Sequence, residues 1–124
     1  MMGDFAGSRP GGQMGGSNMA KYLFTGSYTA AGAAGVLKEG GSGRRAATEK
    51  LVASVGGRVE AYYFAFGSDD FYLIADLPDN VHAAAGSLVA AASGAISTRT
   101  VVLLTPEEID AAAKLTVSYR PPGA

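Results

Sequence analysis

Cysteine is absent from the sequence, which excludes disulfide bonds, thiolate metal sites and a cysteine nucleophile together. Histidine occurs once, at His82, and a single histidine cannot build a histidine-rich metal site. No run approaches the ~20 apolar residues that span a bilayer, and the start lacks the layout of a signal peptide. The net charge of -1 gives no electrostatic footprint for nucleic acid or an anionic membrane. We therefore expect a cytoplasmic protein with no metal, cofactor, nucleic-acid or membrane partner.

The composition is that of one folded domain with polar ends. The chain has 124 residues, of which 48% are hydrophobic, enough for a single core. Residues 1–18 are rich in glycine and hold little apolar surface, so they cannot repay the entropy of ordering. We predict a disordered extension over residues 1–18, a domain over residues 19–116 and an extended, proline-containing tail over residues 117–124.

The most informative stretch runs from Arg58 to Asp76, where two aromatic and aliphatic arms flank the turn Gly67-Ser68-Asp69-Asp70. This pattern predicts a β-hairpin with a four-residue loop. Strict alternation along the first arm puts Val59, Ala61 and Tyr63 on one face and Glu60, Tyr62 and Phe64 on the other. The return arm alternates in the same way, and both faces of both arms are largely apolar. We therefore expect both faces of the hairpin to be covered.

The remaining elements complete an α+β pattern of strand, helix pair, strand, strand, helix, strand, helix. Helix starts are marked by Thr29, Ser42 and Asp79 as N-cap candidates, and by a capping box with proline at Thr105-Pro106-Glu107-Glu108. This order predicts a ferredoxin-like βαββαβ domain in which the helices cover one face of a four-stranded antiparallel sheet, with an extra C-terminal helix. The predicted strands are 21–28, 58–66, 71–76 and 95–105, and the predicted helices are 30–41, 44–57, 81–94 and 107–114.

The second face of this sheet has no helix to cover it. Because large exposed apolar patches are rare on monomers, we predict a homo-oligomer, at least a dimer, packed sheet against sheet. Replacing Phe64 or Leu73 with glutamate is expected to weaken assembly in at least one case.

Five segments in sequence order resemble the GYD domain family: YLFTGSYT, LKEGGSGRRAATEKL, YYFAFGSDDFYLIADLPDN, SGAISTRTVVLLTPEE and YRPP. The resemblance covers nearly the whole domain. It implies a ferredoxin-like fold of the dimeric α+β barrel kind, and it implies no established activity. In the family's signature turn a glycine is followed, one residue later, by Tyr-Asp. Here Gly67 and Asp70 fit, whereas Asp69 stands where the tyrosine would be, so a role for a phenol at this turn is in doubt.

A glycine-rich segment before a predicted helix is the first candidate binding site. Gly40 and Gly41 precede Arg44 and Arg45, so free N–H groups at a helix start and two guanidinium groups could bind phosphate or carboxylate. The segment lacks the spacing and the Lys-Ser/Thr ending of a Walker A loop. The alternative is a plain helix junction with solvated or subunit-bridging arginines.

Aromatic residues provide the second candidate, a ligand cavity between the sheets of two subunits. Tyr28, Tyr62 and Tyr63 could orient a small apolar or aromatic ligand or act as acids. His82, in the first turn of a helix, could join them as a base. The alternatives are packing in the core and the interface for the aromatic group and a surface position for His82. The full aromatic group is Tyr22, Tyr28, Tyr62, Tyr63, Phe64, Phe66, Phe71 and Tyr72.

Three functions fit these patterns. The first is a module that binds a small apolar or anionic molecule, the second is a cofactor-free enzyme of monooxygenase or isomerase type, and the third is a structural assembly unit. A cavity between sheet and helices or between subunits favours the first two over the third. Buried titratable groups in such a cavity would favour the enzyme over the binding module.

Overall fold

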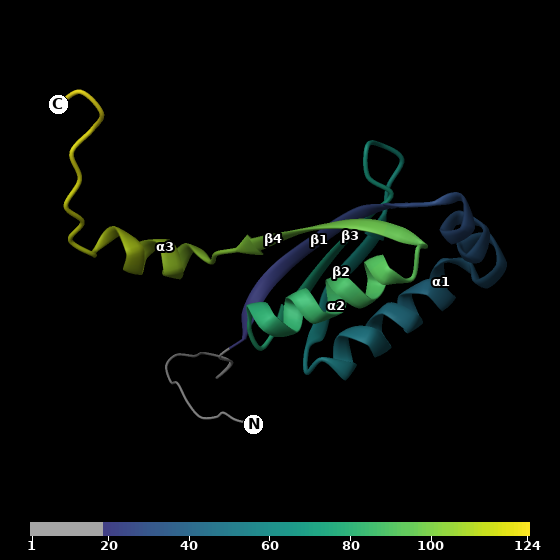
Figure 1. Cartoon of the computed structure of the whole chain (residues 1–124). Helices are drawn as coiled ribbons and strands as arrows, with labels where there is room; N and C mark the ends of the chain where they lie inside the picture. Colours follow the sequence, from purple (N-terminus) through teal and green to yellow (C-terminus); the bar gives the residue numbers. More distant parts are fainter. Residues whose placement is uncertain (1–18) are drawn as a thin grey trace.

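The computed structural model describes residues 19–124, so the extension predicted for residues 1–18 lies outside the described residues. The element order confirms the predicted ferredoxin-like α+β fold with one additional helix (Figure 1). The elements are β1 (Ala20–Tyr28), α1 (Ala30–Ser54), β2 (Arg58–Phe64), β3 (Phe71–Leu77), α2 (Asn80–Ala92), β4 (Ile96–Leu103) and α3 (Pro106–Ala113).

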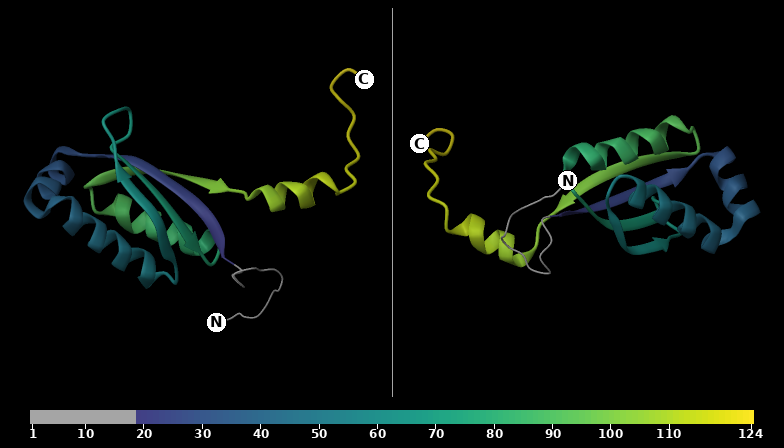
Figure 2. Two further views of the ribbon diagram at one scale, coloured as in Figure 1. Left: turned by 180° about the vertical axis from the view of Figure 1, so that it is seen from behind. Right: turned by 90° about the horizontal axis from the view of Figure 1, so that it is seen from below.

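The sheet is antiparallel throughout, in the order β2-β3-β1-β4. Its central strand β1 pairs with β3 on one side and with β4 on the other. Helices α1 and α2 lie on the same face of the sheet, and the opposite face carries no element of the described chain (Figures 1 and 2). We call these the helix face and the open face.

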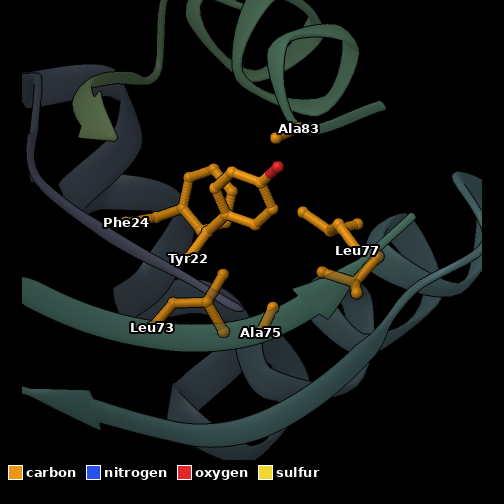
Figure 3. Packing of buried hydrophobic residues seen from close by; sticks show 7 residues of the cluster. Tyr22, Phe24, Leu73, Ala75, Leu77 and Ala83 are labelled. Carbon is orange, nitrogen blue, oxygen red and sulfur yellow. The ribbon is translucent and has the colours of Figure 1, made fainter. Parts of the chain in front are cut away.

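The core lies between the helix face and the two helices. Alternate residues of β1 and β3 are almost fully buried there, and Val52 and Ala83 close the cluster from the helices (Figure 3). Tyr22 is 1% exposed, and its hydroxyl is satisfied by the side-chain oxygen of Asn80 at 2.6 Å. Burying each large side chain stabilises the fold by about 1.5–3 kcal/mol, so this cluster holds the helices on the sheet. Its strand members are Tyr22, Phe24, Leu73, Ala75 and Leu77.

A β-bulge at Glu60 changes the predicted faces of β2. Val59 pairs with Ala75 and Ala61 with Ile74, so two residues of β2 are opposed to a single step of β3. The prediction of strict alternation is therefore wrong at this point, because the extra residue shifts the pleat. Val59 shares the helix face with Tyr62 and Phe64, whereas Ala61 and Tyr63 point to the open face.

The hairpin loop begins one residue earlier than predicted. The Ala65 N–H donates to the Asp70 carbonyl at 2.9 Å, so the loop runs from Phe66 to Asp69. The Phe66 side chain is fully exposed. Asp69 turns back onto the sheet, where it is 8% exposed and accepts a hydrogen bond from Arg99. The loop rises on the side of the sheet away from α2 (Figure 1).

The two predicted helices between β1 and β2 form one kinked helix. Only Gly40 leaves the helical conformation, with φ 78° and ψ 168°, so the predicted loop over residues 40–43 and the predicted helix start at Ser42 are wrong. Glycine tolerates this positive φ, and a single such residue is enough to kink the helix without a longer loop. The predicted helix starts at Thr29 and Asp79 are confirmed: the Thr29 side chain accepts from the Gly32 N–H and the Asp79 side chain from the His82 N–H.

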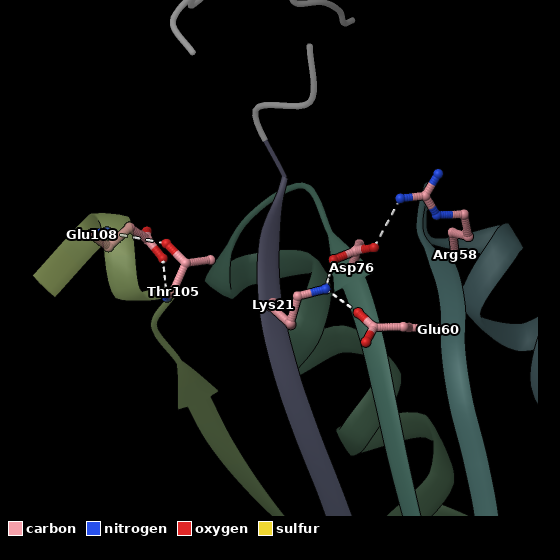
Figure 4. Close-up of polar contacts among 6 residues, drawn as sticks. All are labelled: Lys21, Arg58, Glu60, Asp76, Thr105 and Glu108. Atoms are coloured by element: carbon pink, nitrogen blue, oxygen red, sulfur yellow. Dashed lines mark hydrogen bonds and ion pairs between the residues drawn. The ribbon is translucent and has the colours of Figure 1, made fainter. Parts of the chain in front are cut away.

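The C-terminal helix α3 begins with the predicted capping box. The Glu108 N–H donates to Thr105 Oγ1 at 3.1 Å, and the Thr105 N–H donates to Glu108 Oε1 at 2.8 Å (Figure 4). The helix has no buried residue and continues beyond β4, away from the sheet (Figures 1 and 2). Over residues 19–124, none of the helices combines the length and the apolar character needed to cross a bilayer.

Candidate functional site

A cavity of about 440 Å³ lies between the helix face and helices α1 and α2. Its floor is formed by aromatic and aliphatic side chains of the sheet, among them Phe24, Phe71 and Leu73. Glycines on both helices, Gly35 and Gly86, line the cavity, and a Cβ added at either would meet no atom within 4 Å. Cavities of roughly 300–1,000 Å³ accommodate small organic ligands. The predominantly apolar lining therefore suits a small apolar ligand.

One wall of the cavity is formed by one face of α1, along which a charged side chain is followed by a polar one and then by apolar ones. Arg44, Thr48, Val52 and Val55 all line the cavity, and residues three or four apart share one helix face. Thr48 is 8% exposed, and its hydroxyl has no hydrogen bond to any residue between 19 and 124. A buried polar group without a partner costs about 1–3 kcal/mol, so this hydroxyl is available to a bound molecule.

The hydroxyl groups of two tyrosines lie close together at one end of the cavity. Tyr28 Oη lies 3.3 Å from Tyr62 Oη, although the residues come from β1 and β2, which are not neighbours in the sheet. Both rings pack against Phe71, with ring centroids 5.6 Å and 6.5 Å away. Burial, followed by the hydrogen bond with Tyr62, raises the pKa of Tyr28 well above its ordinary value, while the Arg44 guanidinium acts in the opposite direction. At neutral pH the Tyr28 hydroxyl is therefore protonated and can donate a hydrogen bond.

Arg44 brings a positive charge to this end of the cavity, because Gly41, three residues earlier on α1, lies beside the Phe64 ring that packs near both tyrosines. Its Nη1 lies 3.2 Å from Glu39 Oε2, and both side chains are about one-third exposed. Such a single-contact, solvent-accessible pair is worth ~0–1 kcal/mol. The guanidinium has five N–H donors, so the pair with Glu39 leaves most of its hydrogen-bonding capacity for another anion.

His82 lines the other end of the cavity, on the first turn of α2. Its Nδ1 lies 2.6 Å from Asp79 Oδ1, and its side chain is 46% exposed. The hydrogen bonds from the His82 side chain and backbone lower the pKa of Asp79. Ala83, the residue after His82, packs in the core with Val52 of α1. Val52 comes eight residues after Arg44, and at 1.5 Å per residue the two are about 12 Å apart along the helix axis. His82 and Arg44 therefore stand at opposite ends.

The structure gathers some of the residues singled out in the sequence and separates others. Tyr28, Tyr62, Arg44 and His82 all line the cavity. Tyr63, in contrast, is 70% exposed on the open face.

The glycine-rich candidate is only partly preserved. Gly40 forms the kink and Gly41 lies in helix near Phe64, where an added Cβ would be 3.3 Å from that ring. Arg45 is exposed and does not line the cavity. Glu39 and Thr48 also line the cavity, and the sequence patterns had not predicted either of them as a site residue. The spacing of Arg44, Thr48 and Val52 at four-residue intervals was the signal available for Thr48.

Comparison with known proteins identifies a family but no relative of known activity. The family model described as GYD domain matches residues 22–113, from β1 through α3. Neither the curated proteins nor the solved structures give a significant match. Asp69, at the position where the family pattern has tyrosine, is paired with Arg99. The function therefore has to be inferred from the cavity and surfaces of this chain.

Proposed function

The chain belongs to the GYD domain family, and because this membership carries no activity with it, we propose from the cavity itself that the protein is a small-molecule-binding domain. The ligand lies between the helix face and helices α1 and α2. The observation that carries this proposal is the 440 Å³ space, lined by apolar side chains and opened by helix glycines. A domain that served only assembly would gain stability by filling this space, since cavities cost free energy.

Binding is favoured over the alternative of a cofactor-free monooxygenase or isomerase. Such an enzyme would use a tyrosine or His82 as acid or base. The raised pKa of Tyr28 keeps its hydroxyl protonated at neutral pH. The hydroxyl can therefore donate a hydrogen bond, but the deprotonated form that would act as a base is not populated. This property suits holding a ligand better than removing a proton from it. A cytoplasmic location, expected from the sequence, stays a prediction.

We expect the neutral fluorophore N-phenyl-1-naphthylamine to bind the purified protein saturably at one site per chain. Gly86→Met should weaken this binding about tenfold or more, because the new side chain enters the cavity. An added Cβ at Gly86 meets no atom within 4 Å, and glycine is a poor helix former, so the variant should retain or gain thermal stability. Fluorescence titration measures the affinity.

The matched control is Ala85→Met, at an exposed neighbour that does not line the cavity. It should bind the fluorophore as the unmodified protein does. Native mass spectrometry of the purified protein adds a search for co-purified small molecules. Absence of saturable binding together with absence of bound mass would refute a ligand site here.

We also propose that the protein is a homodimer of the α+β barrel kind, with the open faces packed together. Tyr63 is 70%, Tyr72 40% and Val101 46% exposed on this face. One end of it carries Lys21, Arg58, Glu60 and Asp76 (Figure 4), and the other carries Arg99 with Asp69. The charges at each end are paired with one another within the subunit, so a second copy related by a two-fold axis can pack on the apolar centre without repulsion between unpaired like charges.

The C-terminal arm, residues 104–119, supports the same assembly. It continues from β4 away from the sheet and displays a series of apolar side chains that are 51–76% exposed. Surfaces of this kind are rare on monomers. We propose that the arm packs on the second subunit, since it leaves β4 beside the open-face residue Leu103. The exposed apolar residues are Leu104, Ile109, Leu115, Val117 and Tyr119.

Tyr63→Glu and Tyr72→Glu are each expected to weaken the dimer about 30-fold or more, roughly 2 kcal/mol. The two tyrosines are cross-strand partners on the open face, so either glutamate would bury a charge on dimerisation. Sedimentation at a series of concentrations measures the dissociation constant. Lys50→Glu, at an exposed position of α1, is the control and should leave it unchanged.

Phe64 and Leu73 are unsuited to this test, contrary to the expectation from the sequence. Both lie on the helix face, and Leu73 is 7% exposed within the core. Glutamate at Leu73 would unfold the subunit rather than separate two subunits. A protein that sediments as a monomer at all concentrations would contradict the dimer proposal.

A further inference from the structure

We propose that the ligand of the cavity is an elongated acid whose carboxylate lies among Arg44, Thr48 and the Tyr28–Tyr62 pair, with its apolar body extending toward His82. This inference rests on the proposed ligand-binding function and specifies the chemical class of the ligand.

The first argument is the clustering of hydrogen-bond donors at one end of an apolar space. Arg44 lies three residues after Gly41, where an added Cβ would be 3.3 Å from the Phe64 ring, and the centroid of that ring is 5.3 Å from that of Tyr62 and 6.5 Å from that of Tyr28. This turn of α1 is therefore at the tyrosine end of the cavity, and Arg44 lines it together with both tyrosines. Of the two hydroxyls, 3.3 Å apart, one can donate to the other and leave the second free to donate to a ligand oxygen. A cation together with neutral donors is the arrangement that binds a carboxylate through charge-assisted hydrogen bonds.

The second argument is the unpartnered hydroxyl of Thr48. The residue is 8% exposed, lines the cavity and lies one helical turn from Arg44. Within residues 19–124 nothing bonds to its hydroxyl. Valine has nearly the same shape and would avoid the cost of an unsatisfied polar group. A hydroxyl retained in this position is explained by a ligand oxygen that completes its hydrogen bonding.

Glu39 provides the counter-charge for Arg44 when the cavity is empty. Its single contact of 3.2 Å lies at the partly exposed mouth of the site, directly before the kink at Gly40. A carboxylate entering the cavity would compete with Glu39 for the guanidinium. Removing the Glu39 charge should therefore strengthen the binding of an acid and leave the binding of a neutral molecule unchanged.

The shape of the cavity sets the rest of the ligand. From Arg44 to Val52 the wall extends about 12 Å along α1, and the floor over this length is formed by Phe24, Leu73 and Leu77. No acidic or basic residue other than Glu39, Arg44 and His82 lines the cavity in the described part of the chain. The ligand body is accordingly an aliphatic or aromatic chain without charge.

The test compares octanoate with octanol, two probes that differ only in the head group, at neutral pH. Each is titrated as a competitor of N-phenyl-1-naphthylamine. We expect octanoate to compete about tenfold better than octanol, a ratio typical of one charge-assisted hydrogen bond. Arg44→Gln should abolish this preference and Thr48→Val should reduce it several-fold, with octanol affinity unchanged in both. Glu39→Gln should increase it.

Arg45→Gln is the matched control, because Arg45 is the adjacent arginine, exposed and outside the cavity lining. It should retain the full preference for the acid. Equal competition by octanoate and octanol in the unmodified protein would overturn the proposed acid while leaving the binding function intact. A preference that survives Arg44→Gln would overturn the assignment of the carboxylate to Arg44. Failure of the fluorophore itself to bind would instead remove the proposed function.

Discussion

Gly32→Ala is expected to destabilise the domain by about 3 kcal/mol, although alanine is the better helix former. A Cβ at Gly32 would lie 2.0 Å from the carbonyl oxygen of Ala95 and 2.9 Å from its carbonyl carbon. This backbone cannot move away easily, because the Ala95 oxygen accepts the Thr29 N–H at 2.9 Å and the Thr29 hydroxyl bonds the neighbouring Gly94 oxygen at 2.9 Å. Denaturant unfolding measures the loss.

Gly35→Ala is the matched control in the same helix. Its added Cβ meets no atom within 4 Å, so only the helix propensity changes, and we expect a gain of about 0.5–1 kcal/mol. The two substitutions are chemically identical and should have opposite signs. Equal effects would mean that α1 and the Gly94-Ala95 connection are not in close contact.

Asp76→Asn is expected to cost about 2 kcal/mol at neutral pH. Asp76 is 8% exposed on the open face and accepts hydrogen bonds from Lys21 Nζ at 2.8 Å and Arg58 Nη2 at 3.0 Å (Figure 4). An asparagine amide would retain one acceptor and direct its NH₂ group at a cation. The control is Glu60→Gln, which removes the charge of an exposed partner of the same lysine and should change the stability by less than about 1 kcal/mol.

The effect of Asp76→Asn should depend on pH in a defined direction. Burial alone would raise the pKa of Asp76, but the hydrogen bonds from Lys21 and Arg58 outweigh it, and the net pKa is lowered. A carboxyl group with a lowered folded-state pKa stabilises the protein above its unfolded pKa, about 3.9, and this contribution is lost as pH falls toward the folded value. The stability difference between the unmodified protein and the Asp76→Asn variant should therefore be full at pH 7 and diminish below about pH 4.

Lys21, in the same cluster, is expected to stabilise the fold at neutral pH and to lose this contribution at alkaline pH. Hydrogen bonds to Asp76 and then to Glu60 raise the pKa of Lys21. Its contribution is fully present below the unfolded lysine pKa of about 10.4 and is lost as pH rises through the higher folded value. Unfolding curves between neutral and strongly alkaline pH would test this. A stability difference between the unmodified protein and the Asp76→Asn variant that stayed constant from about pH 3 to pH 7 would contradict the role assigned to Asp76.

The sequence alone determined the order of the elements and where most of them begin. Thr29, Asp79 and Thr105 each cap a helix through a side-chain oxygen that accepts an N–H three residues ahead. Such bonds join residues that are adjacent in the chain, so the residue types and their spacing suffice to predict them. The aromatic and apolar strand segments are equally distinct in the sequence, and their order predicts the ferredoxin-like fold.

Only the tertiary structure decided which residues meet at the site. The bulge at Glu60 arises from the register between β2 and β3, and it moves Tyr62 to the helix face and Tyr63 to the open face. Tyr28 and Tyr62 are 34 positions apart in the chain, and the packing of Gly41 against Phe64 brings the Arg44 turn of α1 to the same end of the cavity. Contacts of this kind depend on how strands and helices pack over long sequence separations, and no local pattern specifies them.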